Sequence, residues 1–167
     1  MPVRSKKIFL VLSIIVPILF YCIYYYGMMV KNAPYKFSEL QSIQFQYGYR
    51  DSMLNKYDSR TDSYQYLNRK DSLVKIHLRL TNDDLLYLHR KAAELGFWDF
   101  PADETNNESK ARVPRFIIQY NYKRKSKKVT FDANFDGHEK LVDANQRLIK
   151  ELQKMLSGAE SRQKNIK

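Results

Sequence analysis

The stretch that decides the fold is Leu73-Val74-Lys75-Ile76-His77-Leu78-Arg79-Leu80-Thr81-Asn82-Asp83-Asp84-Leu85. From residue 74 to residue 80, apolar side chains at even positions alternate with polar ones at odd positions, which predicts a half-buried strand over residues 73–80. Thr81 and Asp84 then have the spacing of a capping box, in which each side chain accepts a hydrogen bond from the other residue's backbone N–H. The sequence therefore predicts a strand followed at once by a helix.

The end of this helix is also visible in the sequence. Leu85, Leu88, Ala92 and Leu95 recur at helical spacing and form its predicted buried stripe. Gly96 suits the left-handed conformation that ends many helices. The aromatic residues that follow, before Pro101, are expected to pack the helix against a sheet.

Further elements lie on both sides of this core. Alternation predicts strands over 42–49, 64–66, 116–122 and 129–131, and helical spacing predicts a last helix over 138–156. Residues 50–60 and 102–113 are interpreted as loops. The tail 159–167 is polar and is expected to fray. We expect the last two strands to form a hairpin whose tip is strongly basic.

This order of elements predicts an α+β fold, with an antiparallel sheet of about five strands and two helices packed on one face. An N-terminal transmembrane helix is expected to precede it. The predicted organisation is a transmembrane signal anchor over 1–31, a tether over 32–41, an α+β domain over 42–157 and a polar tail over 158–167.

The expected anchor is the uncharged run from Ile8 to Val30. Its 23 residues would rise about 34 Å as a helix, enough to cross a hydrocarbon core of about 30 Å. Its exit lacks small residues for signal cleavage, and Cys22 lacks the small neighbours of a lipid-attachment signal. Basic residues before the run favour a single-pass topology with a cytoplasmic N-terminus and an extracytoplasmic domain.

Two motifs suggest a resemblance. The helix opener Leu80–Leu85 and the closing segment Leu95–Pro101, followed by a hairpin and a final helix, resemble small bacterial envelope domains of unknown function that are often borne by lipoproteins. The resemblance covers residues 42–156. It implies a fold and a cell-envelope location, and it supplies no site residues.

The main candidate binding feature is the basic segment, which we define as residues 123–128. It places five cations in six residues, namely Lys123, Arg124, Lys125, Lys127 and Lys128. The formal charge is +11, and without Arg4, Lys6 and Lys7 it is +8 for residues 31–167, from 26 basic and 18 acidic side chains. This surplus favours anionic surfaces such as lipid head groups or acidic polymers. Solvation of a hairpin tip explains the same residues.

Catalytic and metal motifs are weak. His77, His89 and His138 are too far apart in the sequence to form a metal-binding pair. Asp132, Asp136, His138 and Glu139 cluster, but their spacing differs from that of an EF-hand, and capping of the last helix by Asp136 accounts for them. The chain has no nucleophile elbow or phosphate-binding glycine loop. We therefore expect no catalytic residue, metal or cofactor.

The leading hypothesis is a membrane-anchored envelope protein that works as a non-catalytic binding or accessory module. Its expected partners are the lipid bilayer, and an anionic lipid or an envelope protein. One alternative is an accessory enzyme that acts on an envelope polymer. Another is a cytoplasm-facing nucleic-acid-binding domain that uses Tyr120, Tyr122 and the basic segment. The leading hypothesis expects no nucleic acid, and it leaves the oligomeric state open.

Overall fold

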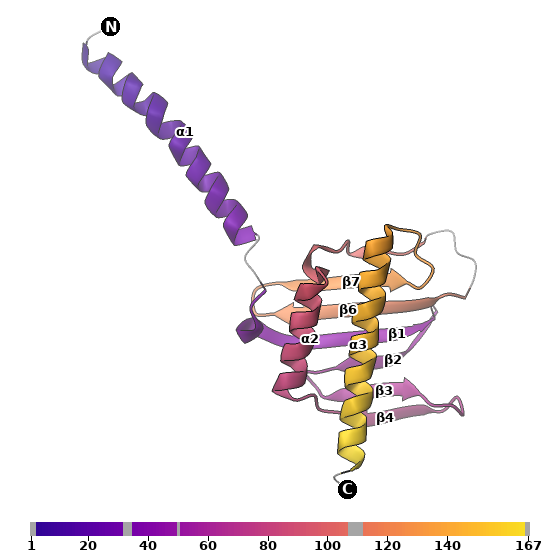
Figure 1. Ribbon diagram of the computed structural model, residues 1–167. Coiled ribbons are helices and arrows are strands. Elements are labelled where there is room, and N and C mark those ends of the chain that lie inside the picture. Colours follow the sequence, from indigo (N-terminus) through magenta and orange to yellow (C-terminus); the bar gives the residue numbers. More distant parts are fainter. Residues whose placement is uncertain (1–2, 32–34, 50, 107–111, 166–167) are drawn as a thin grey trace. The chain divides into compact units, whose positions relative to one another are not determined.

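The computed structural model describes residues 3–31, 35–49, 51–106 and 112–165, and Figure 1 shows their elements. The chain divides into two compact units, Met1–Tyr35 and Lys36–Lys167. The first unit contains the helix α1, which covers Val3–Lys31 and includes Pro17. The second unit contains a sheet and the helices α2 and α3.

The predicted transmembrane anchor is corrected by the structure. Over the residues that the structure describes, none of the helices combines the length and the apolar character needed to cross a bilayer. The transmembrane, signal-anchor and single-pass predictions, and the topology built on them, are therefore not supported.

The second unit is built on a seven-stranded sheet with the order β4-β3-β2-β1-β6-β7-β5. The strands are β1 (Leu40–Tyr49), β2 (Ser52–Asp58), β3 (Ser63–Leu67), β4 (Leu73–His77), β5 (Asp103–Glu104), β6 (Pro114–Tyr122) and β7 (Ser126–Asp132). All neighbours are antiparallel except β5 and β7, which run parallel, so the sheet is mixed.

The prediction of about five antiparallel strands was wrong in two places. β2 forms within the expected loop 50–60, although Tyr57 is its one buried residue and the rest of the strand is too polar to alternate clearly. Pairing with β1 and β3 holds this strand in place. β5 forms within the expected loop 102–113 and is too short to leave a pattern.

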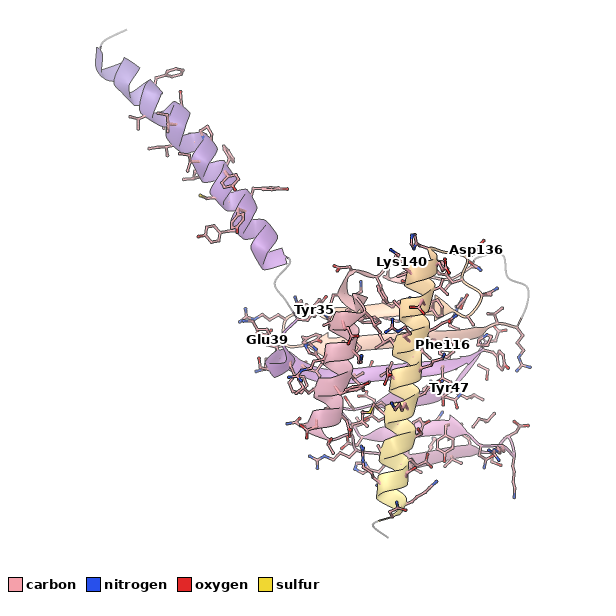
Figure 2. All side chains as sticks on the ribbon, viewed as in Figure 1. Tyr35, Glu39, Tyr47, Phe116, Asp136 and Lys140 are labelled. Atoms are coloured by element: carbon pink, nitrogen blue, oxygen red, sulfur yellow. The ribbon has the colours of Figure 1, made fainter. Side chains whose placement is uncertain are left out.

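Two helices cover one face of the sheet (Figure 1). They are α2 (Asn82–Glu94) and α3 (Glu139–Lys164). Tyr47 of β1 lies opposite Phe116 of β6 in the register, and both side chains lie on the helix side of the sheet (Figure 2). The core between the layers contains Ile43, Phe45, Leu88, Ile118, Tyr120, Val129, Phe131, Leu148 and Leu152, all at most 1% exposed.

The opposite face of the sheet carries polar side chains. Gln44 pairs with Gln119 across β1 and β6, and Lys56 pairs with Gln65 across β2 and β3. These residues alternate with the buried ones, because successive side chains of a strand point to opposite faces. An antiparallel sheet with one solvated face shows this alternation.

The local signals around α2 are confirmed. Thr81 and Asp84 form the predicted capping box, with both reciprocal hydrogen bonds present. Gly96 has a left-handed backbone conformation, with φ 76°. Directly after it, Phe97 is fully buried, and the Trp98 ring lies 5.3 Å from the ring of Tyr120. The aromatic segment therefore packs α2 against the sheet.

The last helix is longer than its periodicity indicated. α3 continues through Gly158 to Lys164, and Ala159 is buried, so the expected frayed tail is largely helical. Its N-cap is His138, whose Nδ1 accepts a hydrogen bond from Lys140 N, and not the predicted Asp136.

An ion pair connects the two helices. Arg162 Nη2 lies 2.5 Å from Asp84 Oδ2, and the Asp84 side chain is only 9% exposed. The same carboxylate oxygen accepts from Thr81 N at 2.9 Å. Asp84 thus caps α2 and also fixes the last turns of α3.

We expect Asp84→Ala to lower the free energy of unfolding by about 2 kcal/mol, because the cap and a nearly buried hydrogen-bond network are lost together. Arg162→Ala should cost less than about 1 kcal/mol, since the arginine side chain is 51% exposed. Urea unfolding followed by circular dichroism measures both changes. Equal losses for the two variants would contradict this assignment.

Candidate binding groove

A groove lies between the edge strand β4 and the last turns of α3. It has a volume of about 470 Å³ and is lined by Tyr66, Val74, Ile76, His77, Glu160, Gln163 and Lys164. The strands supply an apolar floor and the helix supplies a polar rim. We call this site the β4 groove.

The register of β3 and β4 explains the floor. Tyr66 lies opposite Val74, and Ile76 lies opposite Tyr64. Because Tyr64 packs at the edge of the core, these side chains all point to the helix side. The C-terminal end of α3 extends past β4 (Figure 1), which leaves Val74 and Ile76 only half-buried beneath the helix end.

Hydrogen bonds fix the rim. Tyr66 donates its hydroxyl hydrogen to Glu160 Oε1 at 3.0 Å, and Lys164 Nζ lies 2.8 Å from the same oxygen. The Tyr66 ring also packs against Tyr64, with the ring centroids 5.0 Å apart. A strand residue and two helix residues therefore form one connected polar wall.

The electrostatics of this wall favour binding over acid–base chemistry. The hydrogen bond from Lys164 lowers the pKa of Glu160, so the carboxylate stays ionised near neutral pH. Burial, together with the hydrogen bond to Glu160, raises the pKa of Tyr66. A general acid or base works best with a pKa near the operating pH, and these shifts move both groups away from it.

His77 borders the groove at the end of β4. By the alternation of the strand its side chain points to the opposite face, where it is 69% exposed and its Nε2 lies 3.8 Å from Asp62 Oδ2. Within the described ranges, no group of three or more His, Cys, Asp or Glu side chains is placed to hold a metal ion.

The cations of the basic segment differ in exposure. Lys123, Arg124 and Lys128 are exposed at the turn of the β6–β7 hairpin and on the open face of the sheet. Lys127 points the other way and donates to Phe100 O. Burial lowers the pKa of Lys127. Lys125 is partly buried, and its backbone O accepts from Tyr122 N across the turn.

The two tyrosines on which the nucleic-acid hypothesis depends are buried. Tyr120 is fully buried and donates its hydroxyl hydrogen to Leu88 O, while Tyr122 is 5% exposed with its hydroxyl 2.8 Å from His89 Nδ1. A stacking platform for bases needs exposed rings. These two residues belong to the core.

The acidic cluster near residue 136 is dispersed. Asp132 forms a two-pronged ion pair with Arg115, at 2.6 and 2.9 Å. His138 caps α3, and Asp136 donates its backbone N–H to Asn106 Oδ1. Asp132, Asp136 and His138 therefore serve local structure.

Glu104 has the largest pKa change among the carboxyl groups in the described part of the second unit. Glu104 of β5 is fully buried and accepts from Asn145 Nδ2 of α3 at 2.5 Å. Glu104 Oε1 and Asn145 Oδ1 meet no hydrogen-bond partner among the described residues. Burial raises the pKa of Glu104 to about 7, against smaller opposing effects of Asn145 and Lys127. The hydrogen bond between Asn145 and Glu104 connects α3 to β5. Glu104 does not line the β4 groove.

Comparison with known proteins adds no family. No protein-family model matches the chain, and no curated protein matches its sequence significantly.

Sequence reasoning missed the β4 groove, although one part of it was visible. The alternation over residues 73–80 already places Val74 and Ile76 on the buried face. What the sequence did not reveal is that α3 passes Gly158 and brings Glu160 and Lys164 over that strand. Gly158 does not end the helix, because the next turn is held in place by the buried Ala159 and by the ion pair between Arg162 and Asp84.

The buried Glu104 makes stability depend on pH. Its folded pKa of about 7 lies above the ordinary value of 4.5, so the folded chain binds this proton more tightly than the unfolded chain. The stabilisation is complete below about pH 4.5 and is lost as the pH rises to 7, at a cost on the order of 3 kcal/mol.

We expect Glu104→Gln to be more stable than the wild type at pH 8 and similar to it at pH 4.5. Urea unfolding at a series of pH values measures this difference. Glu160→Gln is the matched control, because the pKa of Glu160 is lowered and not raised. If the wild type became more stable between pH 5 and pH 8, and Glu104→Gln removed that increase, the assignment would be wrong.

Proposed function

We propose that the unit Lys36–Lys167 is a non-catalytic binding module whose β4 groove accepts apolar groups of a partner. The observation that carries this proposal is the apolar floor of Tyr66, Val74 and Ile76, left half-buried beside a rim whose charges are already paired. Ligand sites typically combine an apolar lining with a few fixed polar groups. The β4 groove has this composition.

The enzyme alternative receives less support from the same residues. An accessory hydrolase would need two facing carboxylates, or a histidine within reach of a serine. Glu160 is the one carboxylate among the lining residues, and it is paired with Lys164. His77 faces Asp62.

A small apolar probe tests the proposed binding site. We expect isopentanol, which resembles a leucine side chain, to shift the methyl NMR resonances of Val74 and Ile76 in a saturable way. Val74→Thr keeps a β-branched shape but adds a hydroxyl to the floor, and it should weaken probe binding by about fivefold.

The control is Leu67→Thr. Leu67 lies on the neighbouring strand β3, is 36% exposed and does not line the groove. This variant should leave the affinity unchanged. Uniform shifts over both faces of the sheet, or equal effects of the two variants, would contradict the proposal.

A second candidate function is adhesion to an anionic surface through the basic segment. The exposure of Lys123, Arg124 and Lys128 favours it, since they retain hydrated charges near the hairpin turn. Each cation near an anionic surface contributes on the order of 1 kcal/mol at low salt. Lys127 is excluded from this set because its amine is bound to Phe100 O.

Neutralising these three residues to Gln should lower the preference of the full chain for phosphatidylserine vesicles over phosphatidylcholine vesicles by about a hundredfold at low salt. Vesicle sedimentation measures the ratio. The matched control replaces three exposed cations of α3, Lys140, Arg147 and Lys150, with Gln, so that the net charge is the same. An equal fall in both triple variants would show a response to net charge and not to the hairpin.

A further inference from the structure

We propose that the partner of the β4 groove is an extended peptide segment that pairs with β4 as an additional strand and alternates apolar and acidic residues. This inference rests on the proposed function of the groove. It also names the kind of partner and the backbone contacts that hold it.

The first argument is that β4 has a free edge. In the described sheet β4 is the last strand and pairs only with β3. Asn68 N donates to Ser72 O at 3.0 Å, and Leu78 N donates to Asp62 O at 2.7 Å. Because hydrogen-bonded and non-bonded pairs alternate in an antiparallel ladder, these contacts orient the backbone groups of Val74 and Ile76 toward β3. The N–H and C=O groups of Lys75 and His77 therefore point outward.

The second argument is the position of α3. An added strand would place the side chains opposite Val74 and Ile76 on the helix side, where the groove is open. The end of α3, with Glu160 and Lys164, reaches past β4 and would cover them. The groove thus has the floor and the roof for one more strand, and its apolar floor selects apolar side chains at these positions.

The third argument is the charge on the opposite face. Lys75, His77 and Arg79 are exposed there, and Lys56 lies across Gln65 on the same face. Side chains of an added strand that point to this face meet Lys75. Opposite charges across neighbouring strands stabilise a sheet and like charges destabilise it. Acidic residues at alternate positions therefore fit.

The same charges disfavour a second copy of this chain as the occupant. Two-fold antiparallel pairing of β4 about its middle residue would set Lys75 of one copy directly opposite Lys75 of the other. A partner with alternate acids avoids this repulsion and satisfies the same backbone groups. Addition of a strand to an exposed sheet edge is an established mode of peptide recognition.

The test uses the full chain and a fluorescently labelled peptide of alternating valine and glutamate, six residues long. Fluorescence anisotropy should show saturable binding that weakens as salt is added. A peptide of alternating valine and lysine should bind at least about tenfold more weakly, because it meets like charges at Lys75. A valine–glutamate peptide with N-methylated backbone should also lose binding, since it cannot donate to β4.

Two variants of one residue separate charge from backbone pairing. Lys75→Gln removes the cation and should weaken binding by about fivefold. Lys75→Pro also removes the outward N–H, and should abolish binding while it leaves the ladder to β3 in place, as proline is tolerated where an edge N–H faces solvent. Circular dichroism checks that both variants keep their helices.

Amide hydrogen exchange on the unmodified chain supplies a measurement that depends on no variant. The peptide should slow exchange at Lys75 and His77 and leave Val74 and Ile76, already paired with β3, nearly unchanged. Equal binding of the N-methylated peptide, or of the valine–lysine peptide, would overturn the inference. So would a peptide-free dimer, detected by light scattering, with slow exchange at Lys75 and His77.

These results distinguish the two proposals. If isopentanol shifts the Val74 methyl resonances but the peptide does not slow exchange at Lys75, the groove binds apolar groups and the strand-addition inference is wrong. If neither probe affects these residues, both proposals are wrong.

Discussion

Burial of one face of the β1–β6 pair is the constraint on which the rest of the second unit depends. These two strands lie at the centre of the sheet, and their register sets Ile43 against Tyr120 and Phe45 against Ile118. All four side chains are at most 1% exposed. A shift of one residue in this register would move every one of them to the solvated face. The helices α2 and α3 can pack only where this apolar face is presented.

The position of α3 follows from this face, and the β4 groove follows from the position of α3. The helix contributes Leu148, Leu152 and Leu156 to the core and then continues past the edge strand β4 (Figure 1). Asp84 and Glu160 hold its last turns, through Arg162 and Tyr66 respectively. Because these contacts join polar side chains at the helix end, they fix that end without filling the space above Val74 and Ile76. The groove is therefore a consequence of a helix that continues past the edge strand of the sheet.

The sequence predicted those elements whose signal is local. The capping box at Thr81, the left-handed Gly96 and the alternation in β1, β4 and β6 each depend on a few neighbouring residues, and each is present. β2 and β5 were missed because their stability comes from neighbouring strands and not from an apolar pattern of their own. The uncharged run at the N-terminus predicted a transmembrane helix, but none of the helices in the described part of the chain is long and apolar enough to cross a bilayer.

The candidate sites show the same limit. A count of cations found the basic segment, but only the hairpin geometry shows that Lys127 turns inward to Phe100 O while Lys123 and Arg124 stay exposed. The β4 groove joins residues about 90 positions apart, as in the hydrogen bond between Tyr66 and Glu160. No pattern within one segment reports a contact of that kind. The histidine and aspartate residues near position 138 formed a candidate metal-binding cluster in the sequence. In the structure His138 caps α3 and Asp132 forms an ion pair with Arg115.

The two margins of the sheet differ in a way that limits how this protein can assemble. At one margin β5 is two residues long, and a very short edge strand offers little for another chain to pair with. At the other margin β4 is longer and offers its outward backbone groups. If β4 accepts a strand as we propose, this sheet can take up one partner strand and then has no second long edge from which a chain of copies could grow.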